Sequence, residues 1–318
     1  MDYVRLGRTN LRISRLGLGA MGMGAKAWRS WVLEEDESRP VVAAALEAGI
    51  NLFDTCDFYS AGRSEEVLGT LLAEMATREE AVIATKVGMP MGKGPNARGY
   101  SRKHILDACD ASLKRLGTDY IDLYQTHIWD PETDIEEMVE AFADLVRAGK
   151  VRYVGATDMP AWQFAKAIYH ARHNGLAGFV SMQNHYNLVW REDERELMPF
   201  CRAESIGLIP YSPMARGFLC GPDRKTARAG DDEYADIWYG RPADRAVAAV
   251  VADVAAARGV EPGQVAVAWV AAQPGVAAPI IGAGSNVHVA AAVAALDLAL
   301  DADEMERLGA AYAPRPAG

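Results

Sequence analysis

The chain has 318 residues, a 50% hydrophobic composition and a net charge of −10 at pH 7. This acidic balance argues against a nucleic-acid-binding surface, because neutralising phosphates requires clustered Lys and Arg. The length exceeds the usual size of one hydrophobic core, but α/β barrels of this length fold as one domain. We therefore expect a single domain that covers residues 1–318.

The four cysteines, Cys56, Cys109, Cys201 and Cys220, form no Cys-x-x-Cys pair and match no zinc-binding spacing. We therefore expect no metal site, and free thiols in a reducing cytoplasm. No signal peptide is visible, and polar residues interrupt the Ala- and Val-rich stretches near the end, so no membrane span is expected. Cys56 lies close to Asp54, and we interpret it as filling a small-residue position; a reactive thiol is the alternative.

Strand-like and helical patterns alternate along the chain, after an expected hairpin at residues 3–13. The expected strands cover residues 13–19, 52–54, 81–85, 120–126, 151–156, 178–183, 206–211 and 277–281. The expected helices cover residues 41–49, 64–75, 101–117, 134–149, a segment opened by Pro160, 193–205, 242–258, 262–273 and segments that follow Ser285 and Asp301.

Several helix starts carry capping signals. Ser64, Ser101 and Ser285 stand where a side-chain oxygen can accept from the first free backbone N–H groups. Asp134 with Glu137, and Asp301 with Glu304, have the spacing of a capping box. A long loop without a helical or strand pattern is expected at residues 212–240.

Eight strand–helix units predict a parallel sheet. In one chain of this length they predict a (β/α)₈ TIM barrel with an N-terminal hairpin and extra C-terminal helices. A doubly wound sheet is the alternative, but it lacks a Gly-x-Gly-x-x-Gly turn between its first strand and helix. Residues 17–22 fit that spelling, yet no helical pattern follows them directly, so we interpret them as turn glycines.

Three of the expected strands end in titratable residues, namely Asp54, Lys86 and His127, and Tyr59 follows shortly after Asp54. The carboxyl ends of barrel strands share one face, so these side chains should be neighbours. A Lys cation beside Tyr59 would lower the pKa of the phenol, and Asp54 would balance the buried charge. His127 would orient a carbonyl group, and Tyr59 would protonate it. A barrel-end salt bridge with two packed rings is the alternative.

These four residues, each in its expected segment, resemble the catalytic residues of the aldo-keto reductase family. The resemblance extends across nearly the full length of the chain. Further matching segments are 155–158, the strand ending in Gln183, 211–219 and 279–283. Residues 124–130 and 181–191 look closest to bacterial and fungal branches that act on general aldehydes and sugar-like carbonyls. The resemblance implies an oxidoreductase that reduces aldehydes or ketones to alcohols with NADPH, with Tyr59 as the general acid.

The resemblance also implies roles for individual residues. Tyr211 would stack on the nicotinamide, and Thr157 and Gln183 would hydrogen-bond its carboxamide. The substrate would meet Tyr59 and His127. Independently of the resemblance, four tryptophans fall in or near the expected loops on this face and are candidate walls of an apolar pocket: Trp31 and Trp129, and also Trp28 and Trp190. The full set of implied cofactor contacts is Gly22, Met23, Asp54, Thr157, Gln183, Tyr211, Ser212, Met214, Arg216, Gly217, Gly282 and Ser285.

The chain departs from the family pattern after the last strand. The family usually has Lys or Arg just after the Gly-Ala of that strand, to hold the 2′-phosphate, whereas this chain has Gly284, Ser285 and Asn286. Near the expected adenine position it has alanines, and His288 is either a surface residue or an adenosine contact. The family resemblance makes NADPH the expected cofactor, but this departure from the family pattern leaves NADH open.

Two other functions stay open at this point. Lys86 on a barrel strand is also suited to a Schiff-base lyase. A reductase-like module that senses cofactor for a partner, without catalysis, is the third interpretation. For the reductase, the expected partner is a small aldehyde or ketone, and neither a nucleic acid, nor a membrane, nor an obligatory protein partner is indicated.

Overall fold

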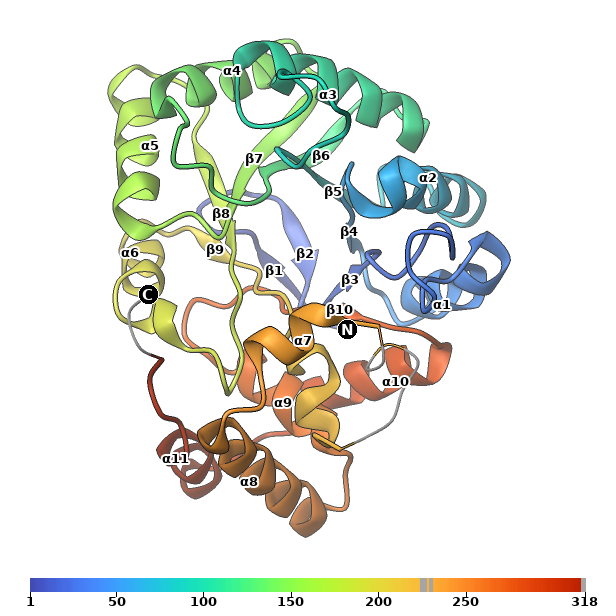
Figure 1. Ribbon diagram of the computed structural model, residues 1–318, viewed down its shortest axis with the longest axis vertical. Helices are drawn as coiled ribbons and strands as arrows, with labels where there is room; N and C mark the ends of the chain where they lie inside the picture. Colours follow the sequence, from blue (N-terminus) through green and yellow to red (C-terminus); the bar gives the residue numbers. More distant parts are fainter. Residues whose placement is uncertain (224–227, 229–230, 316–318) are drawn as a thin grey trace.

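A closed barrel of eight parallel strands forms the centre of the protein, as the sequence predicts (Figure 1). The computed structural model describes residues 1–223, 228 and 231–315. Neighbouring strands follow the order β10-β3-β4-β5-β6-β7-β8-β9. Parallel bridges from Leu208 to Val276 and from Tyr211 to Ile280 join the two edges. The strands are β3 (Gly17–Gly19), β4 (Leu52–Asp54), β5 (Val82–Val87), β6 (Ile121–Thr126), β7 (Val151–Thr157), β8 (Phe179–Gln183), β9 (Gly207–Leu208) and β10 (Ile280–Gly282).

Helices surround the strands, and α8 and α11 lie together at one end of the view in Figure 1. The α-helices are α1 (Glu35–Glu47), α2 (Arg63–Met75), α3 (Arg102–Leu116), α4 (Ile135–Arg147), α5 (Ala161–His173), α6 (Leu197–Ala203), α7 (Glu233–Trp238), α8 (Pro242–Arg258), α9 (Pro262–Ala271), α10 (Asn286–Ala294) and α11 (Ala302–Ala310). Short 3₁₀ helices are η1 (Tyr59–Gly62), η2 (Glu192–Glu194), η3 (Ala215–Cys220) and η4 (Ala295–Asp297).

The predicted hairpin closes the amino-terminal end of the barrel. Strands β1 (Tyr3–Arg5) and β2 (Arg12–Ser14) pair antiparallel, and Leu6 and Ile13 are fully buried in the apolar cluster inside the barrel. Gly7 has a φ of +55°, and a Cβ there would lie 2.7 Å from the backbone nitrogen of Gly207. The turn therefore sits directly on the strand ends, which leaves the opposite face for a site.

Some predicted boundaries are wrong. The strand expected at 13–19 is divided between β2 and β3, and β9 is shorter than the strand expected at 206–211. The expected loop 212–240 contains η3 and α7; its residues 224–227 and 229–230 lie outside the described residues. Helix α6 likewise covers only part of the helix expected at 193–205.

The capping predictions had mixed outcomes. Ser101 and Ser285 accept from the predicted backbone N–H groups, and Asp301 and Glu304 form a capping box. Ser64 is not a cap, because α2 begins after Gly62 and the Ser64 hydroxyl donates to the carbonyl of Ala20 at 2.7 Å.

The box predicted at the start of α4 is only half formed. Asp134 accepts from the backbone N–H of Glu136 and Glu137, as expected of a cap. The carboxylate of Glu137 instead accepts from the backbone N–H of Arg102 in the first turn of α3, at 2.8 Å. The free backbone N–H at the start of α3 thus takes the Glu137 carboxylate that would have completed the capping box of α4.

Replacing Gly69 with Ala should destabilise the protein, although Ala favours helix. Gly69 lies in α2 where a Cβ would overlap the carbonyl group of Leu116 in α3. We expect the free energy of unfolding to fall by about 1–3 kcal/mol from overpacking. The matched control is Gly309→Ala in α11, where a Cβ would meet only the Arg191 guanidinium at 3.7 Å. That variant should gain up to about 1 kcal/mol. Urea unfolding of both measures the contrast, and equal midpoints would contradict it.

Candidate active site

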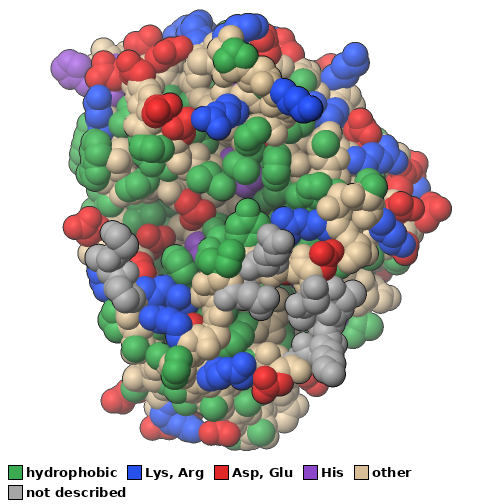
Figure 2. Space-filling model, viewed as in Figure 1, with side chains coloured by type: hydrophobic (Ala, Val, Ile, Leu, Met, Phe, Trp, Pro, Cys, Tyr) green, Lys and Arg blue, Asp and Glu red, His purple; other side chains and the backbone are tan. Residues whose placement is uncertain are grey.

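Four titratable side chains converge at the carboxyl ends of β4, β5 and β6, as predicted. Asp54 is the last residue of β4, Lys86 pairs with Gln125 near the end of β5, and His127 directly follows β6. Tyr59 begins η1 on the adjoining loop. Figure 2 views this face and shows hydrophobic side chains around a central hollow that contains histidine atoms.

Lys86 and Asp54 form a buried ion pair. The Lys86 Nζ donates to Asp54 Oδ2 at 2.6 Å and to the carbonyl oxygen of Thr55 at 2.9 Å, and the Lys86 side chain is 0% exposed. Burial alone lowers the pKa of Lys86, but the charge of Asp54 and the neighbouring Tyr59 and Cys56 outweigh it, so the pKa is raised. Lys86 therefore remains a cation at neutral pH.

The second oxygen of Asp54 is held from two other strands. Its Oδ1 accepts from Nε2 of Gln183 at 2.7 Å and from Nε2 of Gln125 at 3.2 Å. A buried ion pair is tolerated where further hydrogen bonds satisfy its remaining polar atoms. Gln183 thus has a structural task that the sequence did not indicate, in addition to its expected place beside the cofactor.

Tyr59 lies between the ion pair and His127. The Lys86 Nζ is 5.3 Å from the centre of the Tyr59 ring, and the rings of Tyr59 and His127 meet edge to face at 5.7 Å. Burial raises the pKa of Tyr59 above its ordinary value, although Lys86 acts in the opposite direction. The expected net lowering of this pKa by Lys86 is therefore wrong for this structure. Tyr59 therefore keeps its proton at neutral pH.

The turn that carries Tyr59 is tightly constrained. Ser60 and Ala61 both have left-handed backbones, with φ of 50° and 53°. The Ser60 hydroxyl accepts from the backbone N–H of Ala25 at 3.2 Å, and a Cβ at Gly24 would overlap Ser60. Such backbone conformations persist only where the surroundings enforce them, and they cluster at functional sites.

His127 is neutral. Burial, and then the charge of Lys86, hold the pKa of His127 well below its usual range. Its backbone N–H donates to the Tyr100 hydroxyl at 2.9 Å, and its Nδ1 lies 3.0 Å from the sulfur of Cys56. Sequence analysis missed this contact with Cys56, because a small buried residue in a strand-end loop carries no signal of its partner.

The tryptophans proposed as pocket walls divide into different locations. The Trp28 ring lies 6.2 Å from the rings of both Phe58 and Tyr59, beside the site. Trp31 lies under the guanidinium of Arg228, with 4.6 Å between the charge centre and the ring. Trp129 is partly buried and packs against the hydrophobic core.

On the other side of the barrel mouth, the expected cofactor residues Thr157 and Gln183 pair at the ends of β7 and β8. The hydroxyl of Thr157 and the amide oxygen of Asn184 are buried and have no hydrogen-bond partner among the described residues. Buried polar atoms in native proteins are normally paired. These atoms fit a ligand that carries an amide, such as a nicotinamide ring.

Both the hydroxyl and the ring of Tyr211 are in contact with neighbouring side chains. The hydroxyl donates to Asp158 Oδ2 at 2.8 Å, and the ring stacks on His185 at 5.1 Å. Asp158 Oδ1 accepts from the backbone N–H of His185 at 2.9 Å. Asp158 therefore anchors Tyr211 and does not cap α5, whose N-cap residue is Pro160. Burial raises the pKa of Asp158 to about 7.

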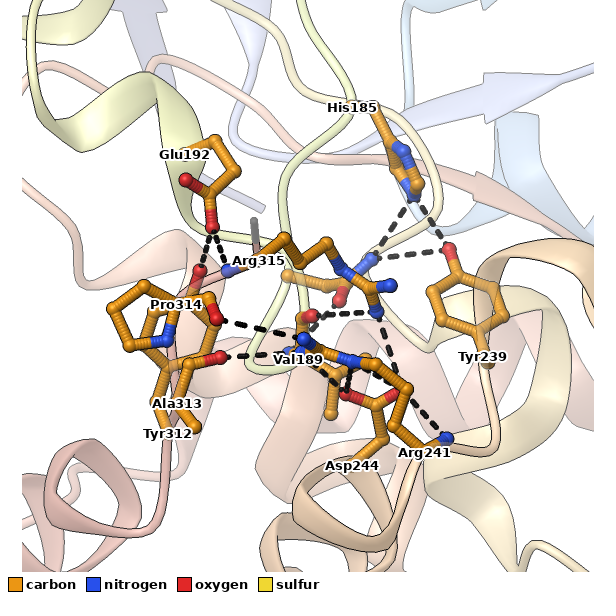
Figure 3. A network of polar contacts seen from close by, with 11 residues as sticks. His185, Val189, Glu192, Tyr239, Arg241, Asp244, Tyr312, Ala313, Pro314 and Arg315 are labelled. Atoms are coloured by element: carbon orange, nitrogen blue, oxygen red, sulfur yellow. Dashed lines mark hydrogen bonds and ion pairs between the residues drawn. The ribbon is translucent and has the colours of Figure 1, made fainter. Parts of the chain in front are cut away.

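The C-terminal segment contacts the residues that follow His185, and Figure 3 shows Arg315 hydrogen-bonded to Val189 and Asp244. His185 stacks on Trp190 at 4.6 Å, and the Arg315 guanidinium lies 4.4 Å from the Trp190 ring centre. Arg315 also donates to the carbonyl of Val189 at 3.1 Å and to Asp244 at 3.2 Å. Trp190 thus backs the stack of His185 and Tyr211. This connection could not be read from the sequence, because it joins distant segments.

The remaining expected cofactor residues lie in three segments: the loop after β3, η3 with the residues before it, and the chain from the end of β10 to the start of α10. Met214 and Gly217 flank Arg216, whose guanidinium pairs with buried Asp232 at 2.7 Å. Nearer the start of the chain, the carbonyl of Gly22 accepts from the backbone N–H of Leu33, and Met23 is buried in the core.

Ser212 and the segment after β10 complete the set. The carbonyl of Ser212 accepts from the Asn187 side chain at 3.0 Å. Gly282 ends β10, and Ser285 caps α10. His288 is exposed and its Nδ1 accepts from the backbone N–H of Gly284 at 3.2 Å.

Neither a metal centre nor a membrane-spanning segment is found in the described part of the chain. No group of three His, Cys, Asp or Glu side chains there is arranged to hold a metal ion. None of the helices in those ranges has the length and apolar character needed to cross a bilayer.

A barrel with a buried Lys–Asp pair, a Tyr and a neutral His at its mouth has the architecture of a (β/α)₈ enzyme. The model of the aldo/keto reductase family matches residues 15–313, and the chain belongs to this family. It is 39% identical to a versiconal hemiacetal acetate reductase of Aspergillus parasiticus, over 99% of this chain and 98% of the relative. It is 37% identical to a putative aryl-alcohol dehydrogenase of Schizosaccharomyces pombe, over 99% and 96%. The protein is thus an oxidoreductase of a family that acts on small carbonyl compounds.

Replacing Arg315 with Ala should loosen the stack behind Tyr211. The change removes a charged hydrogen bond to Asp244, which is 1% exposed, and the cation–π contact with Trp190. We expect the free energy of unfolding to fall by about 1–3 kcal/mol. The control is Arg195→Ala, whose side chain is 56% exposed in a surface ion pair and should change stability little. Denaturant unfolding followed by tryptophan fluorescence measures both, and equal losses would contradict the role of Arg315.

Proposed function

We propose that this protein reduces aldehyde or ketone carbonyls to alcohols with NADPH, and that Tyr59 is the general acid. The observation that supports this most is the Lys86–Asp54 pair, with a 2.6 Å contact, beside a protonated Tyr59 and a neutral His127. When bound, the nicotinamide cofactor would supply the hydride. The free thiols of Cys56 and Cys109 also agree with a reducing compartment such as the cytoplasm.

The chain's own residues account for the proton. Tyr59 donates its hydroxyl proton to the carbonyl oxygen as negative charge develops there. The Lys86 cation then stabilises the phenolate that remains, and Asp54 keeps Lys86 in place. His127 hydrogen-bonds the carbonyl oxygen and orients it.

The cofactor would lie across the mouth of the barrel. Tyr211 would offer a ring for stacking, with Thr157 and Asn184 as hydrogen-bonding partners for the carboxamide. Arg216 and Ser285 would face the phosphates. The support is that Thr157 and Asn184 carry buried polar atoms without partners in the described chain.

The substrate we propose is an apolar or aromatic aldehyde. The ring of Trp28 lies beside Tyr59, and such walls favour apolar ligands. The names of the relatives, a reductase of a hemiacetal acetate and a putative aryl-alcohol dehydrogenase, agree with substrates of this kind.

The alternatives are less well supported. A Schiff-base enzyme needs a neutral amine, whereas the pKa of Lys86 is raised by its neighbours. Trapping of a carbonyl compound on Lys86 by borohydride would favour that alternative. A cofactor-sensing module without catalysis would bind NADPH and show no turnover with a panel of aldehydes.

Replacing Tyr59 with Phe should lower carbonyl reduction by at least about a hundredfold, because a general acid is lost. The Kd of NADPH, measured by fluorescence titration, should stay near that of the wild type. The control is Tyr100→Phe, which removes a hydroxyl bonded to the backbone of His127 and Ile128. That variant should lose less activity than Tyr59→Phe. Near-normal turnover of Tyr59→Phe would remove Tyr59 from the acid role.

Replacing Ser285 with Lys should widen the preference for NADPH over NADH. No Lys or Arg stands at residues 284–286, and one charge-assisted contact contributes roughly 1.5–3 kcal/mol, or about ten- to a hundredfold. Ser285 caps α10, so Ser285→Ala is the matched control that loses the cap without adding charge. The Kd of each cofactor is measured at low and high salt, and the gain should shrink with salt. An unchanged ratio would place the 2′-phosphate elsewhere.

A further inference from the structure

The thiol of Cys56 bridges a catalytic histidine and a buried acid. Its sulfur lies 3.0 Å from His127 Nδ1 and 3.2 Å from Asp57 Oδ1, and it accepts from the backbone N–H of Phe58 at 3.3 Å. Cys56 is fully buried. A thiol has one hydrogen, so Cys56 can donate to His127, to Asp57 or, at the longer distance of 3.9 Å, to the carbonyl oxygen of Lys86, but to only one of them at a time.

The carboxyl group of Asp57 is buried and incompletely hydrogen-bonded. Its side chain is 1% exposed, and its Oδ2 has no hydrogen-bond partner among the described residues. Glu65 of α2 and the hydroxyl of Tyr124 on β6 are its nearby polar neighbours, and Arg115 of α3 provides the opposing positive charge. Burial and the charge of Glu65 together raise the pKa of Asp57 to about 7.

His127 has its own set of neighbours. Lys86 on β5 holds it neutral, Tyr59 meets its ring edge to face, and Tyr100 contacts only its backbone. Its Nε2 has no hydrogen-bond partner within the described ranges, so Cys56 is the polar side chain bonded to this ring. The proton on the neutral imidazole therefore occupies Nδ1 or Nε2 according to what Cys56 does.

We propose that Asp57, acting through the Cys56 thiol, sets the tautomer of His127 and so decides whether its Nε2 can donate to a carbonyl oxygen. When Asp57 is neutral, Cys56 donates to Nδ1, and the imidazole proton sits on Nε2. When Asp57 is ionised, its carboxylate attracts the thiol hydrogen, His127 Nδ1–H donates to the sulfur, and Nε2 is bare. Asp57 and Cys56 are positioning residues, and their effect on turnover rests on the proposed function.

The proton balance of this switch is simple. One proton leaves the carboxyl group of Asp57 for solvent, while the imidazole keeps one proton that moves from Nε2 to Nδ1 by exchange. The thiol keeps its hydrogen, because burial and then Asp57 raise the pKa of Cys56 well above its ordinary value. The donating form of His127 is therefore present below the Asp57 titration near pH 7 and is lost as the pH rises through it.

Nitrogen-15 NMR of labelled histidine side chains tests the switch without requiring turnover. The chain has six histidines, and His127→Asn identifies the signal of His127 by its loss. In the wild type we expect a proton on Nε2 at pH 6 and on Nδ1 at pH 8. Asp57→Asn should hold the proton on Nε2 at both pH values, and Cys56→Ala should abolish the change with pH. Cys109→Ala, which removes another buried thiol, should behave as the wild type.

Kinetics provides the second measurement. Wild-type kcat for aldehyde reduction should fall up to about tenfold per pH unit above pH 7, whereas Asp57→Asn should keep most of its activity at pH 8. Cys56→Ser should keep the fall, because a hydroxyl also has a single hydrogen to donate. One unchanging tautomer of His127 from pH 6 to 8 in the wild type, or an unaltered switch in Cys56→Ala, would overturn the proposal. A tautomer switch without any reductase activity would support the switch and contradict the proposed function.

Discussion

The buried pair of Lys86 and Asp54 is the interaction on which the rest of the site depends. Removing both charges from water is costly, and their attraction offsets that cost only if the other polar atoms are also satisfied. Here the carbonyl of Thr55 and the amides of Gln125 and Gln183 complete the pair. These partners come from β4, β6 and β8 and their ends, so the pair exists only where the closed barrel brings those strands together.

Next to this ion pair, burial determines the protonation states of Tyr59 and His127. Burial keeps Tyr59 protonated and His127 uncharged, and the charge of Lys86 acts with burial on His127 but against it on Tyr59. The site therefore contains one compensated ion pair and two neutral rings, which is suited to hydrogen bonding and proton donation. A bare buried charge would be far more costly.

Local patterns in the sequence predicted the eight units and the four clustered residues well, because a strand end and the residue after it are adjacent in the chain. Contacts that join distant positions were not predictable. Cys56 meets His127 across 71 positions, and Arg315 meets Val189 across 126. The wrong direction for the Tyr59 pKa has the same origin, because burial depends on the assembled fold. Ser64 was misassigned as a cap because its actual partner, Ala20, lies 44 positions away.

The two sides of the site are held by different parts of the chain. The side that contains Asp54, Lys86 and His127 is built from the ends of the neighbouring strands β4, β5 and β6. The side that contains Tyr211 depends on contacts between distant parts of the chain, since Asp158 binds the Tyr211 hydroxyl and His185 stacks on its ring. His185 in turn stacks on Trp190, and the guanidinium of Arg315 lies against the Trp190 ring. Consequently, changes near the end of the chain should reach Tyr211 through this stack, while the ion pair stays intact.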